Sequence, residues 1–290
     1  GDDLRQLVSH QWLSQVRELD LCGNELGDFG TRVLARSPYL QQLEGLDLGF
    51  TNLGNAGLLA LAETPVFSNL QTLSLNDNPR LNRSGLQALG ESPFLGELRT
   101  LDVSGCGLSG EALGELLHPK GALKLRKIVL HGNQLGDAGL ALLVQSIVFA
   151  HTIANGKLNL SRNEIGPTGI RALADSPILE EVETLDLEAN SIGDAGLQAL
   201  AESPYLSKLR TLNLRDNRFG DDGIRALARS PILRTLRELD VTGNLLTQES
   251  LDRLHAASVQ YDWRGLLEIR SDALLRQRPT RISFLRDRVE

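Results

Sequence analysis

Apolar residues recur along the chain in one pattern that repeats about every 27 residues. The first repeat opens at Val16 and reads Val16-x-x-Leu19-x-Leu21-x-x-Asn24-x-Leu26. Repeats of the same form open at Leu43, Leu70, Leu98, Leu125, Asn155, Val182, Leu209 and Leu236. The steps are 27 residues long, except for 28 after Leu70 and 30 after Leu125. Nine repeats in phase indicate a repeat protein rather than two ordinary domains.

Each repeat begins with a strand and a turn. The alternation of apolar and polar residues predicts short strands with one buried face, centred on Leu19, Leu46, Leu73, Leu101, Ile128, Leu158, Leu185, Leu212 and Leu239. Asparagine follows at the turn, at Asn24, Asn78, Asn133, Asn163, Asn190, Asn217 and Asn244. A buried amide there is expected to bridge the backbones of successive turns. Thr51 and Cys106 replace it in the second and fourth repeats.

The second half of each repeat predicts a turn and a short helix. A left-handed backbone is predicted at Gly27, Gly54, Gly136, Gly166, Gly193, Gly220 and Asn82. The next position is expected to cap a helix, through residues such as Asp28, Asp137, Asp194 and Asp221. One such helix covers residues 196–202, with Leu197 and Leu200 on one face. A Ser-Pro pair ends it, because the residue before proline is disfavoured in a helix.

A single repeat cannot bury its own apolar face, so stacked repeats must share one continuous core. Over residues 16 to about 250 the motif resembles leucine-rich-repeat proteins of the ribonuclease-inhibitor-like class. The phrases Leu-Gly-Asp-x-Gly and Ala-Leu-Ala-x-Ser-Pro resemble bacterial repeat proteins of that class. The predicted fold is α/β, a single right-handed leucine-rich-repeat solenoid (horseshoe). One parallel β-sheet is expected on the concave face, with short α-helices on the convex face.

The two ends of the chain differ from the repeats. Residues 1–15 are predicted to be an N-terminal half-repeat or cap, because Leu4, Leu7 and Leu13 align with Ile224, Leu227 and Leu233. The nine repeats then cover residues 16–254. Residues 255–290 are predicted to form a C-terminal cap, in which the last layer is covered by Trp263, Leu266, Leu267 and Phe284. The arginines of this segment leave a second interpretation open, a patch for an anionic partner.

The fifth repeat is the least regular. It carries three extra residues and lacks the Ser-Pro pair. The simplest expectation is a longer convex helix that turns its additional apolar residues inward. An exposed apolar patch would instead indicate a docking surface.

Composition and charge narrow the function. The net charge of −7, without a basic stripe, argues against a nucleic-acid partner. The chain starts without a basic, apolar leader and has no apolar run long enough to span a bilayer. We therefore expect a soluble, cytoplasmic protein that does not bind membranes. Cys22 and Cys106 lie three repeats apart, so both are expected to be free thiols.

A row of acidic residues is the most tempting chemical feature. The position between the two strand leucines holds Asp20, Asp47, Asp102, Asp186 and Asp240. Stacked carboxylates at strand spacing could bind a cation or act in glycoside chemistry. Nearly every repeat carries Asp or Asn here, so a solvated polar ladder is favoured. We expect no catalytic residue, no metal site and no cofactor.

Positions that vary between repeats say more about a partner. In the two positions that follow the second strand leucine, the chain places Phe50, Asp77, His131, Arg162, Glu188 and Arg215. This mixed polar surface with one aromatic residue is typical of a site that binds a protein. An alternative for Phe50 is that it folds over Thr51 and fills the gap in the asparagine ladder.

The sequence as a whole predicts a non-catalytic scaffold that binds a protein on its concave face, as a monomer. An alternative is a regulator of an enzyme, for instance a GTPase activator, as some relatives of this repeat class are. That alternative requires an arginine used in trans, for which Arg162 and Arg215 are candidates.

Overall fold

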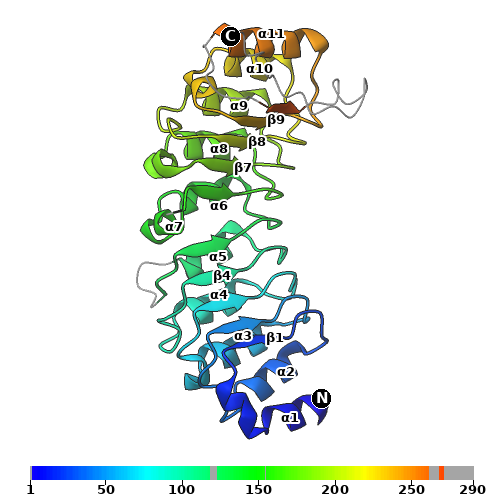
Figure 1. The fold of residues 1–290 in the computed structure, drawn as a ribbon, viewed down its shortest axis with the longest axis vertical. Helices are drawn as coiled ribbons and strands as arrows, with labels where there is room; N and C mark the ends of the chain where they lie inside the picture. Colours follow the sequence, from blue (N-terminus) through cyan, green and yellow to red (C-terminus); the bar gives the residue numbers. More distant parts are fainter. Residues whose placement is uncertain (1, 118–122, 154, 261–267, 271–290) are drawn as a thin grey trace, which may run out of the picture. The chain divides into compact units, whose positions relative to one another are not determined.

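The computed structural model describes residues 2–117, 123–153, 155–260 and 268–270. The chain divides into two compact units (Figure 1). Unit 1 comprises Gly1–Leu135 and Gln145–Ala154, and unit 2 comprises Gly136–Val144 and Asn155–Glu290. The division therefore falls within the irregular fifth repeat. Each unit has its own sheet and its own layer of helices.

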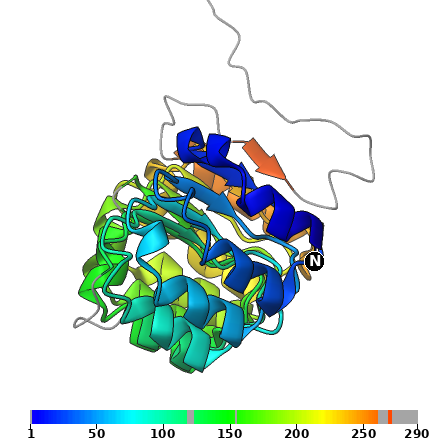
Figure 2. The same ribbon diagram turned by 90° about the horizontal axis from the view of Figure 1, so that it is seen from below.

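In unit 1 the helices gather on one side of the strands (Figure 2). The strands are β1 (Glu18–Asp20), β2 (Gly45–Asp47), β3 (Thr72–Ser74), β4 (Thr100–Asp102) and β5 (Lys127–Val129). The α-helices are α1 (Asp2–Val8), α2 (Gly27–Leu34), α3 (Asn55–Ala62), α4 (Arg83–Gly90), α5 (Gly110–Leu116) and α7 (Ile147–His151). Short 3-10 helices are η1 (Gln11–Gln15) and η2 (Pro65–Phe67).

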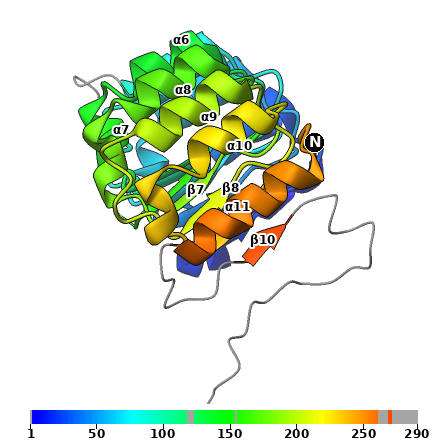
Figure 3. The same cartoon turned by 90° about the horizontal axis from the view of Figure 1, so that it is seen from above.

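Unit 2 repeats this arrangement, and Figure 3 shows α8 to α11 side by side. The strands are β6 (Lys157–Asn159), β7 (Thr184–Asp186), β8 (Thr211–Asn213), β9 (Glu238–Asp240) and β10 (Glu268–Arg270). The helices are α6 (Gly136–Leu143), α8 (Pro167–Ala174), α9 (Gly193–Glu202), α10 (Asp221–Leu227) and α11 (Gln248–Gln260). The 3-10 helices are η3 (Pro177–Glu181) and η4 (Pro231–Arg234).

The predicted strand centres and their parallel register are confirmed. Leu19 pairs with Leu46, and the same register continues through the leucine or isoleucine of each next strand within a unit. The expectation of a single sheet is wrong, because the strands form two sheets of five. The tenth strand was also missed: Ile269 of β10 pairs with Leu239. Its repeat is degenerate, since Ser271 stands where the second strand leucine belongs.

The asparagine ladder is confirmed. The Asn190 amide donates to the carbonyl oxygens of Leu160 and Leu187, one in the preceding repeat and one in its own, at 3.0 and 2.9 Å. Its Oδ1 accepts the N–H groups of Asn163 and Ile165 at 3.0 and 2.9 Å. One buried amide thus satisfies four backbone groups that no strand partner reaches.

The turn after the asparagine position takes two forms in most repeats, which the sequence did not reveal. In the first, fifth and seventh repeats the glycine has a positive φ, as predicted for Gly27, Gly136 and Gly193. In the second, fourth, sixth and eighth repeats, the positive φ falls two residues before that position, at Asn52, Gly107, Glu164 and Arg218. The predictions for Gly54, Gly166, Gly220 and Asn82 are therefore wrong, since these residues are extended with negative φ.

The first form of the turn explains why the ladder tolerates Thr51. The Gly27 N–H donates to the backbone carbonyl of Thr51, and the Gly193 N–H donates to that of Asn217, the residue at the asparagine position of the next repeat. Thr51 and Asn217 therefore need no side-chain acceptor. Accordingly the Asn217 Oδ1 is buried with no hydrogen-bond partner in the described chain. Cys106, in the fourth repeat, keeps only the donor function, through its Sγ–H to the Leu75 carbonyl at 3.2 Å.

The acidic residues do cap helices, but the helix belongs to the following repeat. The Asp28 carboxylate accepts the N–H groups of Gly54 and Gly57 at the start of α3, at 2.7 and 2.9 Å. The equivalent contacts join Asp137 to Gly166, Asp194 to Gly220 and Gly223, and Asp221 to Thr247. The expectation that these acids cap helices is therefore confirmed, and because the capped helix belongs to the next repeat, the carboxylates link neighbouring repeats.

The serine of the Ser-Pro pair forms a second inter-repeat link. The Ser203 hydroxyl donates to the Ala174 carbonyl oxygen at the end of the preceding helix, at 2.6 Å, and the Ser230 hydroxyl does the same for Ala201. In unit 1, Ser37 donates to Val8, the last residue of α1. Helix α1 thus packs beside α2 as the other helices pack on each other.

The expectation of a longer helix in the fifth repeat is wrong. Helix α6 has eight residues, the same length as α3 and α8. The extra residues come after it, where a one-turn helix, α7, stands in place of a 3-10 turn. Phe149 of α7 is buried, whereas Leu142 and Ile147 are exposed. Of the C-terminal cap, Trp263, Leu266, Leu267 and Phe284 lie outside the described residues, and the expected boundary at residue 254 falls inside α11.

Candidate functional site

Each unit presents one face of its sheet away from the helices, here called the sheet face. It consists of the residue before the first strand leucine, the residue between the two leucines and the residue after the second, because side chains alternate along a strand. The leucines themselves point into the core, and Leu185 and Leu187 of β7 and its extension are fully buried. The sheet face corresponds to the surface that the sequence analysis called concave.

The acidic row along this face has a structural role. Each carboxylate or amide accepts the backbone N–H two residues further on, as in Asp47 to Gly49, Asp102 to Ser104 and Asp186 to Glu188, at 2.8–3.0 Å. Such side-chain turns favour Asp and Asn over other residues. In the part of the chain that the structure describes, no three His, Cys, Asp or Glu side chains converge as metal ligands would.

Unit 2 has a small hollow on its sheet face. It measures about 210 Å³ and is lined by β7, β8 and β9. The polar residues around it are Thr184, Asp186, Thr211, Asn213, Glu238 and Asp240. These residues were not predicted as a group, although their 27-residue spacing places them side by side on adjacent strands.

Three of the predicted site residues belong to unit 1, at two different positions of the repeat. Phe50 and Asp77 occupy the turn with positive φ (52° and 54°), whereas His131 is on the sheet face. Phe50 is 59% exposed, although it lies next to the fully buried Thr51. The Thr51 hydroxyl donates to the Leu48 carbonyl oxygen at 2.6 Å, so Thr51 itself replaces part of the missing amide. His131 is half-buried, and its Nδ1 is buried with no hydrogen-bond partner among the described residues.

The other three predicted residues belong to unit 2. Arg162, at the turn with positive φ, pairs with Glu188 on the sheet face at 3.4 Å. Glu188 also accepts a hydrogen bond from the Asn213 amide at 3.4 Å. Arg215 pairs instead with its neighbour Asp216 at 3.2 Å. The structure thus brings Arg162 and Glu188 together and leaves Arg215 in a separate pair.

Both cysteines are free thiols, as expected, and they differ in environment. Cys22 is exposed on the sheet face, where partial desolvation and the carboxylates of Asp47, Asp20 and Asp77 raise the pKa of its thiol. Burial raises the pKa of the Cys106 thiol to about 11. Neither environment favours the thiolate that a nucleophilic cysteine requires.

Comparison with protein families identifies the repeats. A family model described as "Leucine Rich repeat" matches residues 40–62, 157–174, 182–201 and 205–228, and a second one, "Leucine Rich Repeat", matches residues 97–118. These matches do not distinguish the ribonuclease-inhibitor-like class. The comparison with curated proteins gives no significant match. No helix in the described ranges has the length and apolar character needed to cross a membrane.

Two solved structures are similar at low identity. One is the leucine-rich-repeat ectodomain of the Arabidopsis receptor kinase HAESA in complex with an extended IDA peptide hormone, with 18% identity and a TM-score of 0.41. That match covers 79% of this chain and 38% of the receptor chain, so this chain spans well under half of its length. The other is an internalin from Listeria monocytogenes, with 16% identity, a TM-score of 0.39 and 93% of each chain covered.

Proposed function

The chain is a leucine-rich-repeat protein, and we propose that it is a non-catalytic scaffold that binds a partner protein on its sheet face. The observation that carries this proposal is the contrast between the two sides of each strand. The inward positions are leucine or a similar apolar residue in almost every repeat, as the shared core requires. Of the outward positions, the one before the first strand leucine and the one after the second vary from repeat to repeat, so they are free to match a partner.

Glu188 on the sheet face, and Phe50 and Arg162 at the turns that directly follow it in their repeats, are the strongest candidates for contact residues. The Phe50 ring is exposed and has no role in the ladder, and an exposed aromatic ring offers a large contact area with few rotatable bonds. Arg162 and Glu188 form an ion pair at 3.4 Å, so they present opposite charges side by side. Asp77, His131 and Arg215 complete the proposed set. The alternative function as a GTPase activator has no observation in its favour, since Arg162 and Arg215 both form ion pairs.

Affinity capture with immobilised protein tests the proposal. We expect Phe50→Ala and Arg162→Ala to lose at least one partner that the wild-type protein retains from a native lysate, as measured by mass spectrometry. Their melting temperatures should stay unchanged, because Phe50 is exposed and an exposed ion pair contributes less than about 1 kcal/mol.

Arg171→Ala is the matched control, since Arg171 forms a similar exposed pair with Glu202 on the helical side. It should retain the partners that Arg162→Ala loses. If every captured protein is retained equally by all three variants, the binding surface lies elsewhere.

A further inference from the structure

Helix α2 departs from the other repeats at one exposed position. Phe29 is 43% exposed there. The aligned residues of the next seven repeats are small or polar: Ala56, Ser84, Glu111, Ala138, Thr168, Ala195 and Asp222. A large aromatic side chain at this position is therefore not required by the repeat fold.

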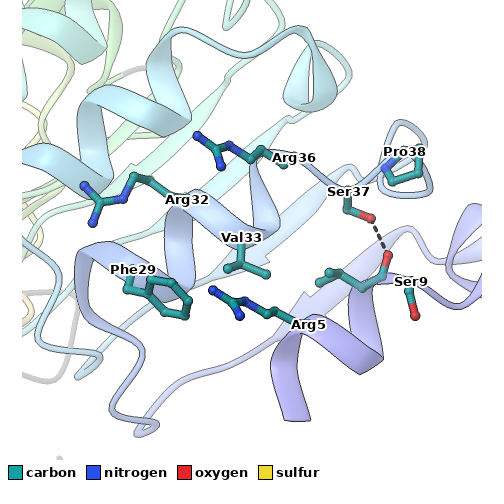
Figure 4. Close-up of a pocket in the computed structure, with 9 residues that line it drawn as sticks. Arg5, Ser9, Phe29, Arg32, Val33, Arg36, Ser37 and Pro38 are labelled. Atoms are coloured by element: carbon teal, nitrogen blue, oxygen red, sulfur yellow. Dashed lines mark hydrogen bonds between the residues drawn. The ribbon is translucent and has the colours of Figure 1, made fainter. Parts of the chain in front are cut away.

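A hollow of about 340 Å³ lies beside Phe29, between α1 and α2 (Figure 4). The side chains of Val8 and Val33 contribute to its apolar lining. The Arg5 guanidinium lies over the Phe29 ring, 4.9 Å from its centroid, an arrangement that orients both groups. Arg32 of α2 and Arg36, two residues beyond the end of this helix, also line the hollow.

A second hollow, of about 490 Å³, lies between α2 and α3. Arg32 and Arg36 line it as well, so the two hollows meet along this edge of α2. Its lining includes Leu59, which is 42% exposed. Exposed apolar side chains thus lie on both sides of a pair of arginines, all within unit 1.

The charge of this surface is opposite to that of the chain. Its lining residues include three arginines and one acidic residue, Glu63, in a protein of net charge −7. Arg36 stands where the second, third, sixth and seventh repeats carry Glu63, Glu91, Asp175 and Glu202. Neither Arg32 nor Arg36 forms an ion pair with any described residue, whereas Arg171 and Arg225, which align with Arg32, both do.

We propose that this surface, formed by Arg5, Phe29, Arg32, Arg36 and Leu59, docks an acidic amphipathic helix of a partner protein. Apolar residues of such a helix fit against Phe29 and Leu59, while its carboxylates pair with the arginines. The chain's own segment 271–290 has the wrong sign, with five arginines and three acidic residues. The surface lies on the helical side, so it is separate from the sheet face and allows the scaffold to hold two partners at once.

Titration with a designed peptide tests this proposal. The probe is an amphipathic helix of about 18 residues, roughly five turns, with leucine and phenylalanine on one face and glutamate along its edges. We expect wild-type protein to bind it, and Arg32→Glu with Arg36→Glu to weaken binding at least about tenfold. Phe29→Ala should weaken it too, without a change of charge. The same peptide with lysine in place of glutamate should not bind.

The eighth repeat provides the matched control. Arg225 of α10 and Arg229, just beyond the end of this helix, occupy the positions of Arg32 and Arg36, but Asp222 replaces the phenylalanine. Arg225→Glu with Arg229→Glu should leave peptide binding unchanged. Failure of the wild-type protein to bind, or an equal loss in both double variants, would overturn the proposal. A concentration-dependent dimer that Arg32→Glu with Arg36→Glu abolishes, seen by sedimentation, would assign the surface to a second copy instead.

Discussion

The Asp194 carboxylate accepts the backbone N–H groups of Gly220 and Gly223, both at 2.8 Å, although these residues belong to the next repeat. Gly220 is the N-cap residue of α10, and its own side chain cannot cap the helix. The first turn of α10 is therefore satisfied from outside. Equivalent contacts at α3, α8 and α11 tie these helices to the preceding repeat in the same way.

Removal of this cap should destabilise unit 2. We expect Asp194→Ala to lower the free energy of unfolding by about 0.5–2 kcal/mol, the usual range for loss of a helix cap. Asp222→Ala, on the exposed side of α10, is the control and should change stability by less than about 0.5 kcal/mol. Urea denaturation measures both. Equal effects would mean that Asp194 is only a surface charge.

Two helical glycines should respond to alanine with opposite sign. A Cβ at Gly169 would lie 2.9 Å from the Asp137 Cα and 2.7 Å from its Oδ1, closer than packed atoms approach. We expect Gly169→Ala to cost about 1–3 kcal/mol. A Cβ at Gly114 in α5 would meet no atom within 4 Å, so Gly114→Ala should stabilise by roughly 0.5–1 kcal/mol through helix propensity. Thermal melts would show a lower melting temperature for Gly169→Ala and a higher one for Gly114→Ala. If both substitutions lowered it, α5 would have to be more closely packed around Gly114 than the structure shows.

The two forms of the turn predict unequal effects for the same substitution. Asn190→Thr removes the acceptor of two buried N–H groups, so we expect a loss of about 1–3 kcal/mol. Asn217→Thr removes a donor but no used acceptor, and a hydroxyl can replace part of the donor function, as Thr51 does towards Leu48. Its cost should be smaller. Chemical denaturation measures the free energy of unfolding of both variants. Identical losses of stability would contradict the two forms of the turn.

The thiols should differ in reactivity. At pH 8 we expect a disulfide reagent to modify Cys22 in the native protein, more slowly than an unperturbed thiol, because its pKa is raised. Cys106 should react only after unfolding, since it is buried and its pKa is about 11. Two thiols that react at one rate in the native state would contradict this assignment.

The Cys106 thiol also links stability to alkaline pH. Its pKa is raised from 9.0 to about 11 in the folded protein, so the unfolded state loses its proton first. The contribution of this thiol to the free energy of unfolding is fully present below pH 9. It declines as the pH rises towards 11, by at most about 2–3 kcal/mol. Cys106→Val should show a shallower decline over this range. An identical slope for both proteins would mean that Cys106 does not contribute.

Much of the fold could be predicted because its signals are local. The alternation around Leu19 or Leu185 indicates a strand with one buried face, and the repeat period sets the register of one strand on the next. The position of an asparagine relative to these leucines was enough to predict its buried amide. The candidate site was predicted less well: Arg162 and Glu188 were named from the sequence, but their ion pair and the hollow around Asp240 follow from the stacking of strands.

The sequence by itself determined the strand centres, the parallel pairing and the ladder, because each depends on residues within one repeat and on the period. Only the tertiary structure decided that Asp194 caps a helix in the next repeat, that Gly27 and Gly54 adopt different turns, and that the strands divide into two sheets. Each of these results depends on what the neighbouring repeat presents. A carboxylate at this position could cap its own helix or the helix of the next repeat, and the local sequence does not indicate which. The distances set by the packing of neighbouring repeats decide it.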